Sequence, residues 1–191
     1  MSDDSRSILE SLAPGEVRVY TLDSGDSATV RGAARSIIGV QIRVAASEIE
    51  LFDTPKGKPY LRNDPGMHFS ISHSRGISMI AVTRVAPVGV DVEQLRVVPN
   101  AETILRRFFT HEAIDEILSD DRRDLRFVEA WTRAEARVKA RGASVWEAAT
   151  IDPDTVVRQI DAPEGFAAAV AAIAPEWWVT QYSLSIADLS G

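Results

Sequence analysis

The stretch RFVEAWTRAEARVKARG, residues 126–142, carries apolar side chains at helical spacing and ends in a glycine. This pattern predicts a long amphipathic helix over 126–141 that stops at Gly142. Glu135 and Lys139 are four residues apart in that helix, so they share one face. An ordinary solvent-exposed helix surface carries such pairs as well, so this spacing alone does not identify a site.

A second charged stretch, VGVDVE at residues 88–93, alternates as a strand does. Side chains alternate across a strand, so Asp91 and Glu93 point to one face and Val88 and Val90 to the other. Two neighbouring carboxylates repel each other unless a cation lies between them. Magnesium accepts such ligands together with phosphate oxygens and water. A solvent-facing strand edge carries the same pattern, so the alternative of a plain surface strand stays open.

The composition describes a globular chain of 191 residues that is 45% hydrophobic and 26% charged. That length suits one large domain or two small ones. The absence of cysteine excludes disulfides and thiolate metal sites. No apolar run approaches 18 residues, and residues 1–15 read as a loose polar leader without a signal-peptide pattern, so we expect a cytoplasmic protein outside the membrane. The net charge of −7 argues against a general nucleic-acid binder.

Basic residues are used unevenly along the chain. Only three of the 21 are lysines, namely Lys56, Lys58 and Lys139, and the rest are arginines. A lysine ammonium is a compact point charge that suits contact with phosphate. Chance retention is the alternative, and it weighs most for Lys56.

Periodicity and turn residues predict an alternation of helices and strands. Helices are expected over 28–45, 101–109, 111–118 and 126–141. Strands are expected over 17–22, 49–52, 67–72, 77–83, 88–93, 155–160, 166–174 and 178–186. Each half of the chain is then a helix followed by antiparallel strands. This order predicts an α+β fold of two similar lobes related by a pseudo-twofold axis, each a long helix on a small antiparallel sheet, with the active site in the cleft between them.

Two polar segments suit the capture of phosphate. FSISHSRG, residues 69–76, leads from a strand into a turn. Ser72, His73 and Ser74 offer hydrogen-bond donors there, and Arg75 offers a forked guanidinium group. A Ser–His nucleophile pair is a weaker interpretation, because adjacency in sequence does not create triad geometry. GKPYL, residues 57–61, is a turn followed by a strand, which a solvated hairpin tip would also show. The histidines lack the spacing of zinc ligands.

Taken in order, five segments resemble the Sfp-like 4′-phosphopantetheinyl transferases. They are GKPYL at 57–61, FSISHS at 69–74, GVDVE at 89–93, RFFT at 107–110 and WTRAEARVKA at 131–140. The resemblance covers about residues 28–142. It implies two α+β lobes, residues 1–92 and 93–191, with coenzyme A bound between them. It also implies transfer of 4′-phosphopantetheine from coenzyme A to a serine of an acyl or peptidyl carrier protein, with release of adenosine 3′,5′-bisphosphate.

The resemblance also assigns roles to individual residues. Asp91, Glu93 and Glu135 would bind magnesium, with manganese as an alternative ion. Lys139 would contact the phosphates and, with Glu135, belong to the catalytic set, in which Glu135 is a candidate base for the serine proton. The residues expected at coenzyme A are Ser72 and His73 at its phosphates, Lys58 and Pro59 at its adenine end, and Arg31 or Arg35 at its 3′-phosphate.

The chain departs from the family pattern at three points. Ala134 stands where the family often has a lysine, which removes a positive charge expected near the phosphates. Arg133 or Arg137 could compensate for that charge, although both point in other helical directions. In the family, a glutamate after the FF motif is sometimes assigned as the base. Here Glu112 follows that motif one residue earlier than usual, so the role of base is not carried over to it. The segment before residue 28 is short, which puts part of the 3′-phosphate pocket in doubt.

Two other functions compete with the transferase. One is a different magnesium-dependent phosphate enzyme, and the other is a non-catalytic relative that binds coenzyme A or carrier proteins. We expect a monomeric transferase whose partners are coenzyme A and a carrier protein. Carrier proteins are usually acidic, so we expect a local basic patch to receive them. The patch candidates are Arg106, Arg107, Arg122, Arg123 and Arg126. The alternative is that these arginines form an ordinary solvated helix surface.

Overall fold

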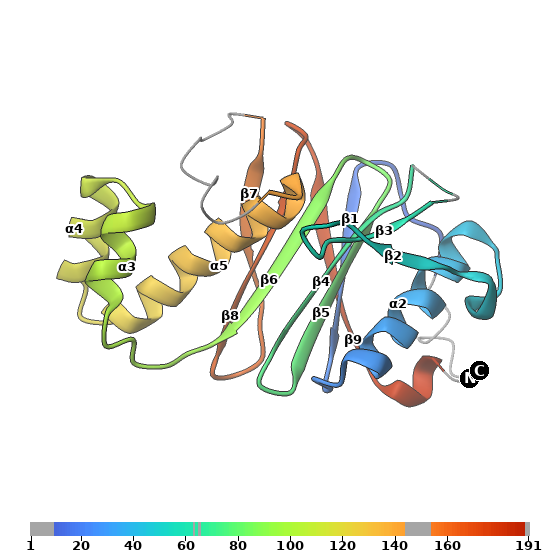
Figure 1. Cartoon of the computed structure of the whole chain (residues 1–191), viewed down its shortest axis with the longest axis horizontal. Coiled ribbons are helices and arrows are strands. Elements are labelled where there is room, and N and C mark those ends of the chain that lie inside the picture. Colours follow the sequence, from blue (N-terminus) through green and yellow to red (C-terminus); the bar gives the residue numbers. More distant parts are fainter. Residues whose placement is uncertain (1–9, 63, 65, 144–153, 190–191) are drawn as a thin grey trace.

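The computed structural model describes residues 10–62, 64, 66–143 and 154–189, and it has a mixed α+β architecture, as predicted. Two sheets lie side by side at its centre (Figure 1). The first has the order β4-β5-β1-β9, with strands His68–Ser74, Ile77–Thr83, Glu16–Leu22 and Trp178–Leu184. The second has the order β6-β8-β7, with strands Val88–Gln94, Phe166–Ala172 and Val156–Ile160. A small hairpin pairs β2 (Leu51–Asp53) with β3 (Pro59–Leu61).

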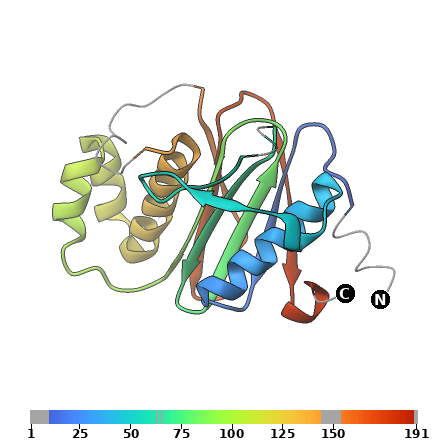
Figure 2. The same ribbon diagram turned by 45° about the vertical axis from the view of Figure 1, so that its right-hand side comes forward.

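Helices cover the outer faces of these sheets. Helix α2 (Ser27–Ile42) packs on the first sheet, and α5 (Arg123–Arg141) packs on β6 and β8 of the second (Figures 1 and 2). Two shorter helices, α3 (Ala101–Phe108) and α4 (His111–Ser119), pack together beside α5. Short 3-10 turns follow α2 and β9, at Ala46–Glu48 and Ile186–Leu189. Helix α5 is thereby held between the second sheet and the α3–α4 pair.

Apolar side chains fill each of the layers. Ile37 and Ile38 of α2 pack on Tyr20 and Ile80 of the first sheet, and all four are fully buried. A second cluster joins the two sheets through Val17, Val19, Met79, Ala81, Val88, Val90, Val92, Ala168 and Val170. Such apolar burial is the main force that holds the layers together.

Most predicted elements are confirmed, and their ends follow local chemistry. The side chain of Asp26 accepts a hydrogen bond from the backbone N–H of Thr29 and caps the start of α2. Gly142 ends α5 as predicted, with a left-handed φ of 61°. Helix α5 begins at Arg123, three residues before the predicted start, because the expected charged loop at 120–123 is shorter than predicted.

Strand β9 departs from the prediction of antiparallel strands in the second half of the chain. It pairs in parallel with β1, from Glu16 opposite Trp178 to Leu22 opposite Leu184. The physical reason lies in the second sheet, where β8 already has β6 on one edge and β7 on the other. Both edges of β8 are filled, so β9 pairs instead with the edge of β1 that β5 leaves available.

The predicted loose leader over residues 1–15 is tied down in part. Residues 1–9 of that predicted segment lie outside the described ranges. Within the described remainder, the backbone N–H of Leu12 donates to the Gln41 side chain at 2.9 Å. The backbone N–H of Ala13 donates to Glu16 at 2.8 Å. In the part of the chain that the structure describes, no helix is long and apolar enough to cross a membrane.

Candidate functional site

Gly89 sets the distance between helix α5 and strand β6. A Cβ atom on Gly89 would lie 2.1 Å from the carbonyl oxygen of Ala136 and 2.3 Å from the backbone nitrogen of Ala140. Any larger residue would therefore push the helix away from the strand. This close approach brings the Glu135–Lys139 face of α5 beside the Asp91–Glu93 face of β6. The two charged stretches that the sequence singled out thus meet.

Lys139, Asp91 and Ser72 form a closed triangle of hydrogen bonds at this contact. The Lys139 Nζ atom donates to Asp91 Oδ1 at 2.7 Å and to Ser72 Oγ at 2.9 Å. The Ser72 hydroxyl donates to the same Asp91 oxygen at 2.9 Å. The Asp91 side chain is only 5% exposed, whereas that of Lys139 is 30% exposed. The ammonium group therefore links a buried carboxylate to solvent.

Burial shifts the protonation of both carboxyl groups near this triangle. It raises the pKa of Asp91, and the neighbouring Lys139 charge offsets part of that rise. Burial also raises the pKa of Glu135, and the negative charge of Asp91 adds to the increase. The Asp91 Oδ2 atom is buried and has no hydrogen-bond partner. A buried carboxylate oxygen without a partner is costly, which favours a cation or donor that arrives with a ligand.

A pocket of about 380 Å³ opens beside the triangle and collects several of the predicted site residues. Lys58 and Pro59 line it from the β2–β3 hairpin, and Glu135 and Lys139 line it from α5. The Lys58 Nζ atom donates to the carbonyl oxygens of Ala140, at 2.9 Å, and Val88, at 3.3 Å. Burial lowers the pKa of Lys58 to about 8. All three lysines of the chain, Lys56, Lys58 and Lys139, thus line one pocket.

The FSISHS segment contributes β4, and its side chains point in two directions. Ser72 is buried and belongs to the triangle, whereas His73 is exposed. The Ser74 hydroxyl donates to Glu93 Oε2 at 3.1 Å, and Arg96 reaches the same oxygen at 3.2 Å. Arg75, expected to offer a fork for phosphate, occupies a left-handed turn position with φ of 48°.

Arg31 and Arg35 lie away from the pocket that Lys58 lines. The Arg31 guanidinium donates to Asp53 Oδ1 at 3.1 Å and to the carbonyl oxygen of Leu51 at 3.3 Å, which ties α2 to β2. Arg35 lines a separate, shallow depression together with Phe52. The geometry therefore groups Lys58 with Lys139 but does not bring these two arginines to them.

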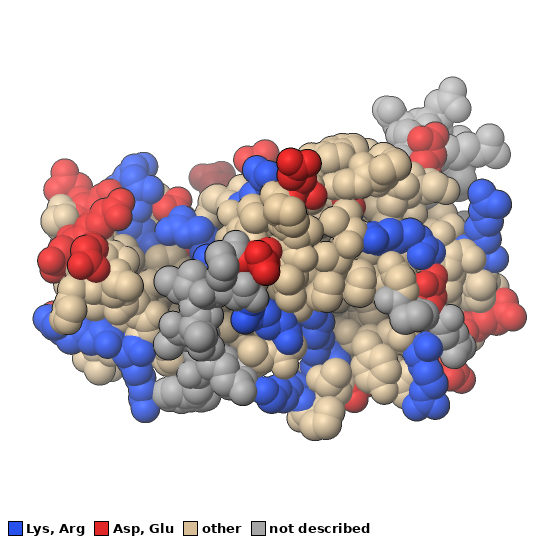
Figure 3. All heavy atoms as spheres, turned by 90° about the horizontal axis from the view of Figure 1, so that it is seen from above, with Lys and Arg blue, Asp and Glu red and all other residues tan. Residues whose placement is uncertain are grey.

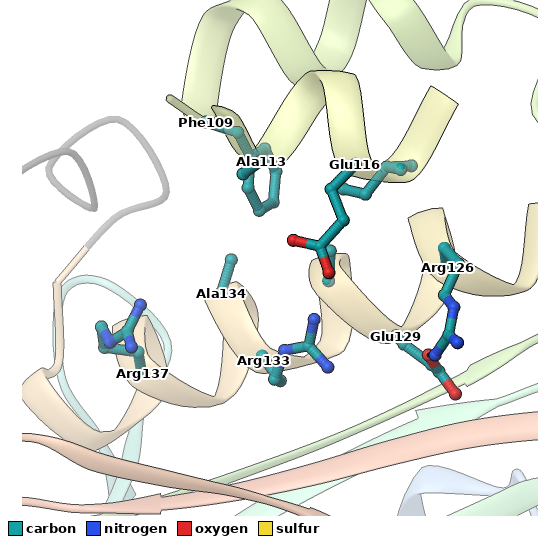
Figure 4. Close-up of a pocket in the computed structure, with 10 residues that line it drawn as sticks. Phe109, Ala113, Glu116, Arg126, Glu129, Arg133, Ala134 and Arg137 are labelled. Carbon is teal, nitrogen blue, oxygen red and sulfur yellow. The ribbon is translucent and has the colours of Figure 1, made fainter. Parts of the chain in front are cut away.

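Ala134 faces a different side of α5 from Glu135 and Lys139. It lines a pocket of about 400 Å³ between α4 and α5, opposite Phe109 and Ala113 (Figure 4). Arg133 and Arg137 line the same pocket, so the expectation that they point in other directions from position 134 is wrong. A 3.6-residue repeat places positions 133, 134 and 137 on one broad face. The alanine thus removes no charge from the Lys58–Lys139 pocket.

The predicted metal ligands do not form a ready-made cluster. Within the described ranges, no group of three or more His, Asp or Glu side chains is arranged to hold a metal ion. Asp91 nevertheless offers its unpartnered Oδ2 atom, and the charges of Asp91 and Glu93 both raise the pKa of Glu135. One or two carboxylates suffice for magnesium when substrate phosphates and water complete its shell. The residues present fit that kind of site.

The expected basic patch is largely engaged by acidic neighbours. Arg106 pairs with Glu102 at 2.6 Å, and Arg126 pairs with Asp120 at 2.8 Å. Figure 3 shows basic and acidic side chains together at the end of the molecule that carries α3 and α4.

Glu112 is exposed in the first turn of α4, and its hydrogen bonds to its own backbone and to Thr110 lower its pKa. A carboxyl group with a lowered pKa is a weaker base, so the structure gives no reason to assign Glu112 the role of general base.

Two contributors to the site were missed in the sequence. Gly89 is required for the α5–β6 contact, and Ser70 joins β4 to β6 through its hydroxyl, as does Ser74, which the sequence predicts as a donor to phosphate. A signal was present for the serines, because positions 70, 72 and 74 alternate on one strand face. The glycine signal was the interruption of a valine-rich strand, which often marks close backbone approach.

Comparison with known proteins agrees with this geometry. The 4′-phosphopantetheinyl transferase HetI of Nostoc is 31% identical over 120 residues, 60% of this chain and 51% of that protein. The enzyme psf-1 of Bacillus pumilus is 34% identical over 98 residues, 50% and 41% of the two chains. The enzyme Sfp of Bacillus subtilis is 31% identical over 110 residues, 56% and 48%. The chain spans about half the length of the curated relatives it matches.

The matched regions include both charged stretches of the site. A profile of the 4′-phosphopantetheinyl transferase superfamily matches residues 87–185, just over half of the chain. That range begins before β6 and includes all of α5, β7, β8 and β9. The ion pair between Lys139 and Asp91 therefore lies wholly within the matched part. By this match, the chain belongs to the 4′-phosphopantetheinyl transferase superfamily.

Proposed function

We propose that this chain transfers 4′-phosphopantetheine from coenzyme A to a serine of an acyl or peptidyl carrier protein. The observation that carries the proposal is the α5–β6 contact, where Lys139 bridges Asp91 and Ser72 beside a pocket lined by Lys58 and Glu135. Three lysines and a carboxyl group around one pocket suit a pyrophosphate and a proton acceptor. Membership of the transferase superfamily supports the same reaction.

The proposed reaction exchanges the phosphoanhydride bond of coenzyme A for a phosphate ester bond to the carrier serine. The carrier serine oxygen forms a bond to the β-phosphorus of coenzyme A, and the bond from that phosphorus to the bridging oxygen breaks. Adenosine 3′,5′-bisphosphate leaves with that oxygen. The serine proton passes to Glu135, directly or through water, because burial and Asp91 raise the pKa of this carboxyl group toward that of a useful base. Lys139 offsets the charge that develops on the leaving group.

Magnesium is proposed to complete the site. Asp91 would hold it through Oδ2, with Glu93 and Glu135 as further ligands or as partners of its waters. When bound, the ion would neutralise the pyrophosphate and polarise the reacting phosphoryl group. Lys139 already occupies Oδ1 of Asp91, so the two cations would use different oxygens of one carboxylate.

Coenzyme A is proposed to lie along the pocket with its phosphates toward Lys139 and its adenine end toward Lys58 and Pro59. Lys58, Pro59 and Lys139 line the same pocket, which supports placing both ends of the molecule within it. His73, exposed on β4, remains a proposed phosphate contact. A role for Arg31 or Arg35 at the 3′-phosphate would require coenzyme A to extend beyond this pocket, since neither lines it.

A division into two similar lobes, 1–92 and 93–191, remains a proposal. The packing of α2 on one sheet and α5 on the other supports it. Strand β9, however, belongs to the second half of the chain and pairs with β1 of the first. The lobes would therefore be joined by this exchanged strand.

The experiment is to mix the protein with an apo carrier protein, coenzyme A and magnesium, and to weigh the carrier by mass spectrometry. A gain of one phosphopantetheine group is expected, and a carrier whose acceptor serine is replaced by alanine should gain nothing. If several acyl and peptidyl carriers gain no mass while the protein binds coenzyme A, the chain is a non-catalytic binding relative and the proposal fails.

A further inference from the structure

Strands β4 and β6 are joined by serine hydroxyls. The backbone N–H groups of β6 donate to serine oxygens of β4 in three successive pairs, each with an offset of 20 residues. The pairs are Val90 to Ser70 at 3.1 Å, Val92 to Ser72 at 3.4 Å and Gln94 to Ser74 at 3.3 Å. Because the offset is constant, the strands run in the same direction past each other. We call Ser70, Ser72 and Ser74 the serine seam.

The seam occupies the place of a missing backbone ladder. Strand β4 is an edge of the first sheet and β6 an edge of the second, and the two sheets are separate. Val90 and Val92 are fully buried, so their N–H groups have no access to water as a substitute partner. Buried N–H groups without acceptors are strongly disfavoured. The hydroxyls therefore satisfy the outer edge of β6 and hold it at a fixed position against β4.

Two of the three hydroxyls also hold the carboxylates of the site. Ser72 donates to Asp91 at 2.9 Å, and Ser74 donates to Glu93 at 3.1 Å. Each serine thus accepts a hydrogen bond from one backbone N–H of β6. Its hydroxyl donates to the side chain of the β6 residue that precedes that N–H. At Ser70 the corresponding residue is Gly89, which has no side chain and lies against α5. The seam fixes the β6 backbone and both carboxylates together.

The Ser72 hydroxyl has no hydrogen-bonding capacity left for a ligand. A serine hydroxyl has one donor and two acceptor positions. Its donor serves Asp91, and its acceptors receive Lys139 Nζ and the Val92 N–H. Ser72 is also only 4% exposed. Direct contact with a coenzyme A phosphate would break one of these three bonds.

We infer that the serine seam positions β6, so that Ser72 and Ser74 act through Asp91 and Glu93 rather than by touching the substrate. The inference rests on the proposed function in one respect only, namely that the carboxylates placed by the serine seam are those that bind the metal ion. The geometry of the seam itself depends on no ligand. Ser74 is the most accessible member for a test, because it is half-buried and a threonine keeps its hydroxyl on a strand.

The test compares Ser74→Ala with Ser74→Thr, with Ser183→Ala as a control at an exposed serine of β9. Amide hydrogen exchange of Gln94, resolved by NMR without any ligand, is expected to quicken about five- to tenfold in the alanine variant, as loss of one hydrogen bond predicts. The threonine and control variants should keep the original rate. Equal Gln94 exchange in the alanine variant and the unmodified protein would overturn the seam.

A second readout addresses the carboxylate. Calorimetric titration of magnesium into the protein with coenzyme A should show roughly tenfold weaker binding in Ser74→Ala and none of this loss in Ser74→Thr. In carrier modification, the alanine variant should need about tenfold more magnesium for half its maximal rate, while kcat at saturating magnesium is retained. Unchanged magnesium affinity in the alanine variant would contradict a positioning role for Ser74.

The two proposals fail in different ways. Exchange measurements need no substrate, so an unaltered Gln94 rate speaks against the seam even if the carrier is modified. Conversely, an unmodified carrier together with the expected exchange pattern speaks against the transferase alone. If Ser74→Ala does not fold, the unmodified protein still decides the seam. Its Val90, Val92 and Gln94 amides must then be as protected as ladder amides, and exchange at loop rates would overturn it.

Discussion

The Nζ atom of Lys139 lies 2.7 Å from Oδ1 of Asp91, across the contact between helix α5 and strand β6. The aspartate is almost fully buried, and the lysine is the cation bonded to it. Ser72 completes the arrangement by bonding to both. This relationship connects the fold to the chemistry, because one pair both stabilises a packed interface and presents a positive charge to the adjoining pocket.

Replacing Lys139 with methionine should destabilise the protein through the charge it leaves behind. Removal of one partner of a buried pair exposes the other to an apolar environment without compensation. Lys139 is 30% exposed, so we expect a loss of about 1 to 3 kcal/mol, below the full range for buried pairs. The measurement is urea denaturation. Adding Asp91→Asn should recover part of the loss, and strict additivity of the two changes would contradict the pairing.

Gly89→Ala should separate α5 from β6. The new methyl group would fall 2.1 Å from the Ala136 carbonyl oxygen, so we expect a destabilisation of about 3 kcal/mol or more. Gly32→Ala is the matched control, because nothing lies within 4 Å of its Cβ position in the interior of α2. That change should stabilise the protein by about 0.5 to 1 kcal/mol. Equal effects in thermal unfolding would refute the close approach at Gly89.

The stability of the protein should rise with pH in a window that Lys58 defines. Burial lowers the pKa of Lys58 from its ordinary 10.5 to about 8, so the folded chain releases this proton first. Between pH 8 and 10.5 the unfolded chain holds more protons, and linkage makes the free energy of unfolding increase with pH. Below pH 8 the cost of burying the charge is fully present. The nearby His68 does not share this window, because burial and Lys58 lower its pKa from 6.5.

Lys58→Met should remove that rise. Subtracting the variant from the unmodified protein cancels the other titrating groups, and the difference should change by about 1 to 3 kcal/mol in favour of the unmodified protein between pH 8 and 10.5. The measurement is chemical denaturation at several pH values. Parallel stability curves across the window would show that Lys58 does not titrate as proposed.

Secondary structure was largely predictable because the chain repeats its local signals. The alternation of residues 17–22 and the helical spacing up to Gly142 both match the structure. Pairing was less predictable, because the partner of β9 depends on which sheet edges other strands leave open. Periodicity within one strand carries no information about edges elsewhere.

The site was predictable in its charged residues and less so in their supports. Lys58, Glu135 and Lys139 were singled out as residue types that suit phosphate chemistry, and one pocket unites them. The burial of Lys58 was not predictable, because it arises from α5 and β6, whose carbonyl oxygens accept hydrogen bonds from its Nζ atom. The lowered pKa of Lys58 follows from that burial. Ser72 was expected at a phosphate but forms internal bonds, which only the placement of β6 reveals.

The central claim is that the α5–β6 site performs the transfer, and Glu135→Gln tests it most directly. The rate of holo-carrier formation should fall by at least about a hundredfold, as loss of a general base predicts, while the unfolding midpoint stays near that of the unmodified protein. Glu176→Gln, the same change at an exposed loop position, should keep the full rate. A Glu135→Gln variant that modifies the carrier as fast as the unmodified protein would contradict the account.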